Sequence, residues 1–411
     1  MIPTNEQPYP LPNDWQWVKM KDIATLFTGN SINEKIKTEK YLGKDDGLIY
    51  IATKDIGFDN QIDYATNIRI PASDNFKIAP ANTPLLCIEG GSAGRKLGFT
   101  NKPVCFVNKL CAFVTNKINP KLIYYFLQTQ DFAEQFTAMK HGLIGGVSIK
   151  NLMAVNFPLP PLDEQQRIVS LLDELFADLD AAKALAQSVV DGSELRRTAI
   201  LHKAFTGELT KLWRDEHETT LDSWKKKFLS DALISSKQKT NDFVSSDLKY
   251  VGLENLEKNG GQISFQAADE VRSTKNIFRI GDLLYGKLRP YLNKHGVAKF
   301  DGVCSTDILV FKANEQAEIE FINYFLSLPK FIEYAVANSK GINLPRVSEK
   351  IILRAEIFLP PLQEQKEIVR LLDDLLGREQ RTKEIAGKIL ERVELLKKSI
   401  LAKVFRGKII Y

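Results

Sequence analysis

A loop in the second half of the chain gathers side chains suited to contact with nucleic acid. Residues 281–296 interleave cations with aromatic and amide groups. Lys and Arg neutralise phosphates, and Arg and Asn make bidentate contacts with guanine and adenine. The candidate contacts are Lys287, Arg289, Tyr291, Asn293 and Lys294. The loop predicts a DNA-contacting surface, and a solvated basic loop is the alternative.

The corresponding loop in the first half is rich in glycine. Residues 90–96 read Gly-Gly-Ser-Ala-Gly-Arg-Lys, a run that can hold an anion in a nest of backbone N–H groups. Ser92, Arg95 and Lys96 are its candidate contacts, and a plain turn between strands is the alternative. Further phosphate contacts are predicted just before a Val-Ser pair in each half, at Lys140, His141 and Arg346.

The sequence contains none of the usual catalytic motifs. It has no GxxxxGK[ST] loop, and no Ser-His-Asp or Cys-His arrangement stands at a recognisable spacing. Its four cysteines form no CxxC pair and its four histidines do not complete a zinc site, so no metal is expected. We predict a chain that is not an enzyme.

The amino-acid composition further narrows the class of protein. The 411 residues are 44% hydrophobic and 26% charged, as in soluble globular proteins. Lys and Arg exceed Asp and Glu by 56 to 51, a net charge of +5 that permits DNA binding without establishing it. No apolar run approaches the roughly 18 residues of a membrane span. Few cysteines in a long chain suggest a reducing cytoplasm, where we expect the protein.

Comparing the chain with itself at a shift of 200 residues reveals a tandem duplication. Residues 159–175 and 359–375 agree at twelve of seventeen positions, and both begin Leu-Pro-Pro-Leu. Residues 200–207 and 400–407 also match at this shift, so no net insertion separates the two anchors. The chain is predicted to contain two copies of one unit.

The second part of each copy is predicted to be a long helix. Apolar residues recur at alternating steps of four and three along residues 168–189 and, with polar interruptions, 368–400, as in a coiled coil. A Pro-Pro pair precedes each helix, and Gly207 and Gly407 follow basic last turns. About 44 residues at ~1.5 Å each give a rod of about 66 Å.

The first part of each copy is predicted to be mixed α/β, with short strands followed by an amphipathic helix. The short polar junction, residues 208–224, cannot return the chain along the first rod, so the two helices must run antiparallel. We predict an α+β fold: two mixed α/β domains joined by two long antiparallel coiled-coil helices, a pseudo-two-fold tandem repeat. The predicted segments are residues 1–160, 161–207, 208–358 and 359–411.

The two copies agree best along the helices and least in the loops of the globular parts. Because the outer faces of the two helices repeat, they suit one kind of partner that binds twice. The predicted partner contacts are Gln165 and Gln365, which are identical in the two copies and lie near the helix starts. Differing loops suit two readers of a split, asymmetric target such as duplex DNA.

These features resemble the specificity subunit of type I restriction-modification enzymes, over essentially the whole chain. The segments that carry the resemblance are 11–18, 160–165, 200–209, 281–290, 360–365 and 400–407. The sequence departs from the family at Asn82-Thr83, where Gly-Asp is common. The resemblance implies that residues 1–160 and 208–358 hold two target recognition domains.

The resemblance also implies a non-catalytic reader of double-stranded DNA. Its partners would be a methylation subunit, in two copies, and a restriction subunit. S-adenosylmethionine, ATP and Mg would be bound by those partners and no cofactor by this chain. The rival hypotheses are a bivalent protein-binding scaffold without DNA readout and an autonomous nuclease or methyltransferase.

Overall fold

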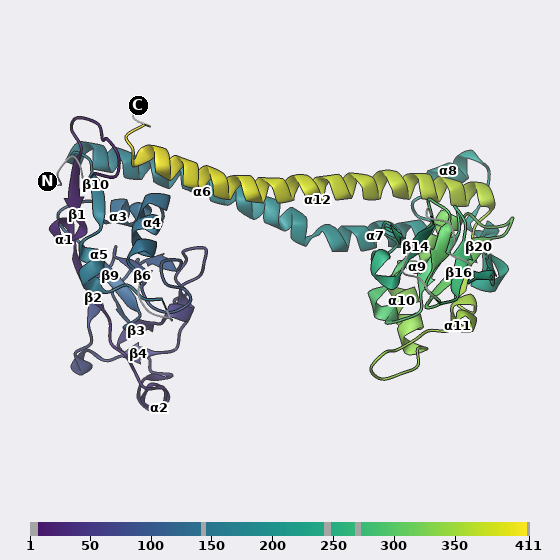
Figure 1. Ribbon diagram of the computed structural model, residues 1–411, viewed down its shortest axis with the longest axis horizontal. Coiled ribbons are helices and arrows are strands. Elements are labelled where there is room, and N and C mark those ends of the chain that lie inside the picture. The colour runs from purple at the N-terminus through teal and green to yellow at the C-terminus, as the bar shows by residue number, and fades with distance from the viewer. Residues whose placement is uncertain (1–6, 141–144, 242–247, 268–272, 409–411) are drawn as a thin grey trace. The chain divides into compact units, whose positions relative to one another are not determined.

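The computed structural model describes residues 7–140, 145–241, 248–267 and 273–408 (Figure 1). The chain divides into two compact units, unit 1 (Met1–Ala186 with Lys388–Tyr411) and unit 2 (Gln187–Gly387). Each unit combines one globular part with segments of both long helices. The predicted segments separated the helices from the globular parts. The structure instead groups each globular part with the stretches of helix that pack on it.

Unit 1 contains three sheets in its described residues, with strand orders β1-β10, β2-β9-β6-β7 and β4-β3-β8-β5. β3 pairs with β8 in parallel, as a crossover connection requires. The strands are β1 (Gln16–Lys19), β2 (Thr25–Thr28), β3 (Leu48–Ile51), β4 (Arg69–Ile70), β5 (Ile78–Ala79), β6 (Pro84–Cys87), β7 (Leu97–Phe99), β8 (Val104–Phe106), β9 (Leu110–Val114) and β10 (Asn156–Leu159). The helices are α1 (Met20–Ile23), α2 (Glu34–Ile36), η2 (Lys37–Tyr41), η3 (Thr53–Asp55), η4 (Ala72–Asp74), α3 (Pro120–Phe126), α4 (Gln130–Ala138), α5 (Ile149–Met153) and α6 (Leu162–Asp191).

The sheet β2-β9-β6-β7 is buried on both faces. Side chains alternate along β6, so Leu86 joins a core with α3, α4 and α6 whereas Leu85 and Cys87 join a second core with β3 and β8. In Figure 1, α3 and α4 accordingly lie between α6 and the sheets of this unit. Burial on both faces explains why these strands are continuously apolar in sequence.

Unit 2 repeats this topology, with sheets β11-β21, β12-β20-β17-β18 and β13-β16-β19-β14-β15, and again a parallel central pair, β14 with β19. The strands are β11 (Lys225–Phe228), β12 (Leu233–Ser235), β13 (Lys239–Thr240), β14 (Lys249–Val251), β15 (Gln266–Ala267), β16 (Lys275–Phe278), β17 (Leu283–Gly286), β18 (His295–Val297), β19 (Gly302–Cys304), β20 (Ile308–Ala313) and β21 (Glu356–Leu359). The helices are α7 (Ser193–Phe205), α8 (Lys211–Glu216), η5 (Leu221–Ser223), η6 (Leu229–Asp231), η7 (Leu253–Asn255), η8 (Pro290–Leu292), α9 (Ile319–Leu326), α10 (Pro329–Ala337), α11 (Glu349–Leu353) and α12 (Leu362–Val404). The predicted α+β tandem fold with a long helix pair is confirmed.

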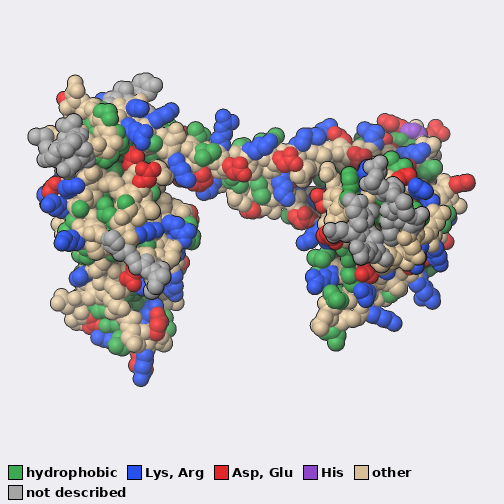
Figure 2. Space-filling view, viewed as in Figure 1, with side chains coloured by type: hydrophobic (Ala, Val, Ile, Leu, Met, Phe, Trp, Pro, Cys, Tyr) green, Lys and Arg blue, Asp and Glu red, His purple; other side chains and the backbone are tan. Residues whose placement is uncertain are grey.

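The long helices run antiparallel within each unit. In unit 1, Lys183 pairs with Glu394 (2.6 Å) and Asp180 pairs with Lys397 (2.5 Å). Residue numbers therefore rise along α6 in the direction in which they fall along α12. In unit 2, Arg196 of α7 pairs with Glu379 of α12 (2.7 Å). Lys, Arg, Asp and Glu side chains alternate along the visible surface of these helices (Figure 2).

The first long helix is interrupted, contrary to the single helix predicted for residues 161–207. α6 ends and α7 begins at Gly192, because glycine has low helix propensity. The Arg196 guanidinium donates a hydrogen bond to the carbonyl of Val189 (2.6 Å). A side chain thus satisfies a backbone carbonyl at the break. Copy two has Arg392 at the matched position, and α12 is continuous.

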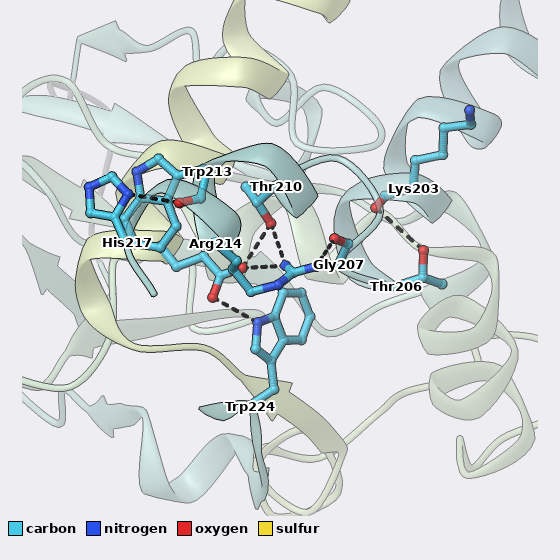
Figure 3. Close-up of polar contacts among 9 residues, drawn as sticks. Lys203, Thr206, Gly207, Thr210, Trp213, Arg214, His217 and Trp224 are labelled. Atoms are coloured by element: carbon cyan, nitrogen blue, oxygen red, sulfur yellow. Dashed lines mark hydrogen bonds and ion pairs between the residues drawn. The ribbon is translucent and has the colours of Figure 1, made fainter. Parts of the chain in front are cut away.

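Residues 208–224, predicted to be only a polar junction, anchor the start of α12 through α8 (Figure 3). The fully buried carboxylate of Glu364 accepts hydrogen bonds from Arg214 (2.6 Å), Thr210 (2.8 Å) and Trp224 (2.9 Å). Arg214 also donates to the carbonyl of Gly207 (2.6 Å), which ties the end of α7 to the same cluster. The junction is therefore a structural element of unit 2.

All four cysteines are buried as free thiols, and three belong to unit 1. Burial raises the pKa of Cys111 and Cys304 to about 12 and that of Cys105 to about 11. Burial also raises the pKa of Cys87. These thiols act as small apolar core residues, as predicted. In the described part of the chain, no helix has the length and apolarity to span a membrane.

Candidate nucleic-acid interface

A tight turn between β17 and β18 presents the basic loop of unit 2. Arg289 and Asn293 both have left-handed backbone conformations, with φ of 51° and 44°, and η8 lies between them. The turn is closed by the Gly286 N–H, which donates to the Lys294 carbonyl (2.8 Å). The Arg289 N–H donates to the carbonyl of Pro345 (2.8 Å), which joins this turn to a second loop.

The matching turn of unit 1 is one residue longer and carries different residues, and its Cys87 N–H donates to the Lys96 carbonyl (2.9 Å) as Gly286 donates to Lys294. Its two left-handed positions are Gly90 (φ 85°) and Gly94 (φ 77°), again four residues apart. Glycine adopts this conformation freely, whereas other residues pay about 1–2 kcal/mol. Asn tolerates it, so the strained position is Arg289. A side chain kept at a strained position points to a function for Arg289.

The second loop, between α10 and α11, projects from the globular part of unit 2 (Figure 1). Lys340 and Arg346 pair as a β-bridge at its base, and Ile342 at its tip is fully exposed. We define the loop face of unit 2 as seven cationic, aromatic and apolar residues chosen from the exposed or half-buried side chains of these two loops. They are Lys287, Arg289, Tyr291, Lys340, Ile342, Leu344 and Arg346.

The loop face is cationic with one carboxylate inside it. Asp307 lies 3.8 Å from Lys287 and 3.6 Å from Arg346, so it holds both without neutralising the surface. Arg289 is exposed and has no ion-pair partner among the described residues. Tyr291 is 54% exposed and available for stacking. The face can contact phosphates and bases together.

Asn293 is not part of this surface, which corrects its prediction as a DNA contact. Its side chain is 1% exposed and its amide nitrogen donates to the carbonyl of Leu326 (2.9 Å). It also lies 3.2 Å from the ring of His295, which in turn contacts Asn323 (2.8 Å). Burial lowers the pKa of His295 to about 4, so the ring is neutral near pH 7. This buried cluster holds the turn in shape.

Two further predicted DNA contacts, Lys96 and Lys294, are half-buried and hydrogen-bonded within the chain. The amine of Lys96 donates to the carbonyl of Thr53 (3.0 Å), and that of Lys294 donates to the carbonyl of Leu253 (2.6 Å). Both acceptors belong to the matching helical turns η3 and η7. The same bond in both copies gives these lysines a structural role, and DNA contact by either of them stays a prediction.

The remaining candidates of unit 1 lie around the glycine turn. Arg95 is exposed, its guanidinium donates to the carbonyl of Gly91 (2.5 Å), and it lies 5.3 Å from the ring centroid of Phe58. Lys140 is exposed above the ring of Phe136 (5.5 Å). Ser92 is half-buried within the turn. His141 lies outside the described residues.

Gln165 and Gln365 are not available to a partner, which corrects their prediction as docking residues. They are 4% and 0% exposed. Each donates to the proline carbonyl before its helix, at Pro160 (3.0 Å) and Pro360 (2.8 Å). Each also accepts a backbone N–H before α3 or α9, from Asn119 and Glu318. Their identity in both copies follows from this shared internal role.

Sequence reasoning missed the loop of residues 340–346 as a unit, apart from Arg346. Its signal was an exposed Ile-Asn-Leu run held between Gly341 and Pro345, beside Arg346. Such apolar residues in a loop do not fit a core and therefore indicate contact with something else. Within the described ranges, no group of three or more His, Cys, Asp or Glu could hold a metal ion.

A family model described as the type I restriction modification DNA specificity domain matches the chain twice, at residues 12–189 and 224–394. The specificity subunit of type I restriction enzyme EcoDI from Escherichia coli is 30% identical over 285 residues, 62% of this chain and 62% of that subunit. The chain thus spans less than two thirds of that relative. The EcoKI specificity subunit from Escherichia coli K12 is 25% identical over 437 aligned positions, 97% of this chain and 90% of that subunit.

Two solved structures share the fold. A chain from a structure on complex assembly and conformational transition of the type I R-M system aligns with a TM-score of 0.70 at 17% identity, covering 98% of this chain and all of that one. The HsdS subunit from Thermoanaerobacter tengcongensis aligns with a TM-score of 0.61 at 17% identity, covering 99% and 100%. At this identity the likeness is one of fold.

Proposed function

The chain belongs to the family of type I restriction modification DNA specificity domains, and from that premise we propose that its two units read the two halves of a split, asymmetric DNA target. Members of the family recognise DNA sequence, and catalysis lies on partner subunits. The double match of the family model supports one recognition domain in each unit.

The observation that carries the split target is the pair of matching turns. Both have two left-handed positions four residues apart, which supports a common scaffold for the two turns. Unit 1 places Gly90 and Arg95 there, whereas unit 2 places Arg289 and Tyr291. One scaffold with two sets of side chains supports two different half-sites.

Duplex binding at several salt concentrations tests this function. We expect the complex of this chain with its methylation subunits to bind its methylated site specifically, with log Kd rising linearly with log salt because phosphate contacts release counterions. The site itself follows from sequencing methylated adenines in cells that express the complex. Binding that is independent of salt and of sequence would contradict DNA readout and favour a protein scaffold.

We propose that one methylation subunit docks on each unit, on apolar side chains that the long helices leave exposed. Leu195 and Leu395, matched across the duplication, are 76% and 65% exposed. Leu185 and Ile385, also matched, are 70% and 58% exposed. Exposed leucines repeated at equivalent sites suit one partner bound twice.

Replacing Leu195 and Leu395 together with glutamate is expected to reduce assembly with the methylation subunit at least tenfold, because two carboxylates would be buried unpaired. Size-exclusion chromatography with light scattering measures the assembly. Leu212→Glu is the matched control, since Leu212 is also 76% exposed but lies on α8, outside the two long helices. Equal assembly of the double variant and the Leu212→Glu control would show that Leu195 and Leu395 are not part of the interface.

We also propose a restriction subunit as partner, with S-adenosylmethionine, ATP and Mg bound by the partners and none by this chain. Adenine methylation and DNA cleavage would then occur on those subunits after this chain has bound its site. Such a complex acts on DNA in the cytoplasm, where we place it.

A further inference from the structure

The two-stranded sheets β1-β10 and β11-β21 are equivalent, but one face of each is covered differently. Trp17 faces Pro158 in unit 1, and the matching pair in unit 2 is Lys226 with Phe358. Trp17 is 2% exposed, whereas Phe358 is 57% exposed. The same surface is therefore buried in one unit and open in the other.

In unit 1 the cover is Tyr9, from the segment before β1. Its ring lies edge-on to Trp17 (4.9 Å between centroids), and Trp17 donates to the Tyr9 carbonyl (3.1 Å). The Tyr9 hydroxyl donates to the carbonyl of Phe405 (3.2 Å) at the end of α12. Burial raises the pKa of this phenol, with the nearby Asp131 carboxylate as a second cause. One tyrosine thus closes the site.

In unit 2 the equivalent surface is a groove of about 740 Å³. Its wall includes Phe205, which matches Phe405, and Phe331 of α10. Phe228 and Phe358 stand 48% and 57% exposed along its sheet side. Most of the groove lining is apolar or aromatic, as at the site that Tyr9 fills, and charged side chains stand among these residues.

The charges of the two sites differ at matched positions. In unit 1, Asp131 pairs with Arg406 (3.2 Å) beside Tyr9. In unit 2 the matching residues are Lys330 and Thr206, so the carboxylate is replaced by a cation and the arginine by a neutral residue. Lys330 and a second cation of the groove, Arg354, have no ion-pair partner among the described residues, whereas the carboxylate of the groove, Glu356, pairs with Lys226 (2.9 Å). An occupant of this groove meets positive charge where Tyr9 meets a closed ion pair.

We propose that the groove of unit 2 binds an extended segment of a partner subunit that carries an aromatic side chain with a carboxylate next to it. The aromatic ring would cover Phe358 as Tyr9 covers Trp17, and the carboxylate would pair with Lys330 or Arg354. This inference rests on the proposed assembly with partner subunits. Because unit 1 fills its own site, the segment would bind once per chain.

Photochemical crosslinking in the assembled complex tests the proposal. The photoreactive residue p-benzoylphenylalanine replaces Phe358 in the full chain, and mass spectrometry identifies the crosslinked peptide. The matched control carries the same residue in place of Ile234, which is also 57% exposed but lies on β12. The probe at Phe228, on the neighbouring strand, serves if position 358 does not tolerate it.

We expect at least tenfold more crosslinking to a partner subunit at position 358 than at 234, to one segment with an aromatic residue beside Asp or Glu. Lys330→Glu should lower that yield at least fivefold. A complex that assembles and binds DNA but lacks this crosslink would overturn this inference and leave the proposed function intact. Crosslinking to a second copy of this chain, or to a segment without an aromatic residue, would have the same meaning. If the unmodified chain neither assembles nor binds DNA, the proposed function fails, and this inference fails with it.

Discussion

Arg289→Gly is expected to weaken binding to the half-site of unit 2 without weakening the fold. Loss of a bidentate base contact costs about 1–3 kcal/mol, roughly 5- to 150-fold in Kd, and relaxes specificity at one base pair. The backbone at this position has φ of 51°, which glycine adopts without strain. Stability should therefore stay the same or rise by up to about 1 kcal/mol. Duplex-binding titrations and thermal unfolding of the same sample measure both effects.

Asn293→Gly is the matched control for this prediction, because Asn293 has φ of 44° in the same turn. Its amide is buried and hydrogen-bonded to the carbonyl of Leu326, so its removal should cost about 1–3 kcal/mol of stability. The two glycine variants thus separate an exposed contact from a buried support. Wild-type affinity and specificity in Arg289→Gly would exclude Arg289 from the interface.

Glu364→Gln is expected to be the most destabilising single substitution near the helix starts, by about 3–5 kcal/mol, because it leaves the buried charge of Arg214 unpaired. Three donors converge on the two oxygens of Glu364. Glutamine offers one oxygen and adds an NH₂ group, so a donor also loses its acceptor. Chemical denaturation of the full chain measures the change in free energy of unfolding.

Glu164→Gln provides the control in the other copy. Glu164 accepts one hydrogen bond, from the indole N–H of Trp15 (2.8 Å), and its second oxygen has no partner in the described structure. Glutamine can keep the bond to Trp15, so the expected loss is about 1 kcal/mol or less. Equal losses in the two variants would show that Arg214 adds nothing to the stability of unit 2.

The duplication and the α+β fold were predictable because repetition at one shift is a strong signal. Matching strands and helices recur in the same order in both units, down to the parallel central pair. The break at Gly192 was not predicted, since the apolar seam of residues 168–189 ends just before it and the match with copy two extended the predicted helix to residue 207. Periodicity describes which face is buried, whereas local propensity decides where a helix stops.

The candidate site was predictable by region but not by side chain. Cations and amides in a loop suit phosphates and bases, yet the sequence does not reveal whether a side chain turns inward, as that of Lys294 does toward Leu253. The duplication offers a better guide than residue type. Bonds repeated in both copies, such as those of Gln165 and Gln365, belong to the scaffold, and the unrepeated Arg289 remains the predicted DNA contact.

The buried thiols give this chain an intrinsic chemical reporter. Thiolates rather than thiols react with alkylating reagents, and burial both shields these sulfurs and raises their pKa values. Alkylation must therefore wait for local or global opening of the fold. Cys304 reports on unit 2, and Cys87, Cys105 and Cys111 report on unit 1, so one labelling time course resolves the opening of each unit in the intact protein.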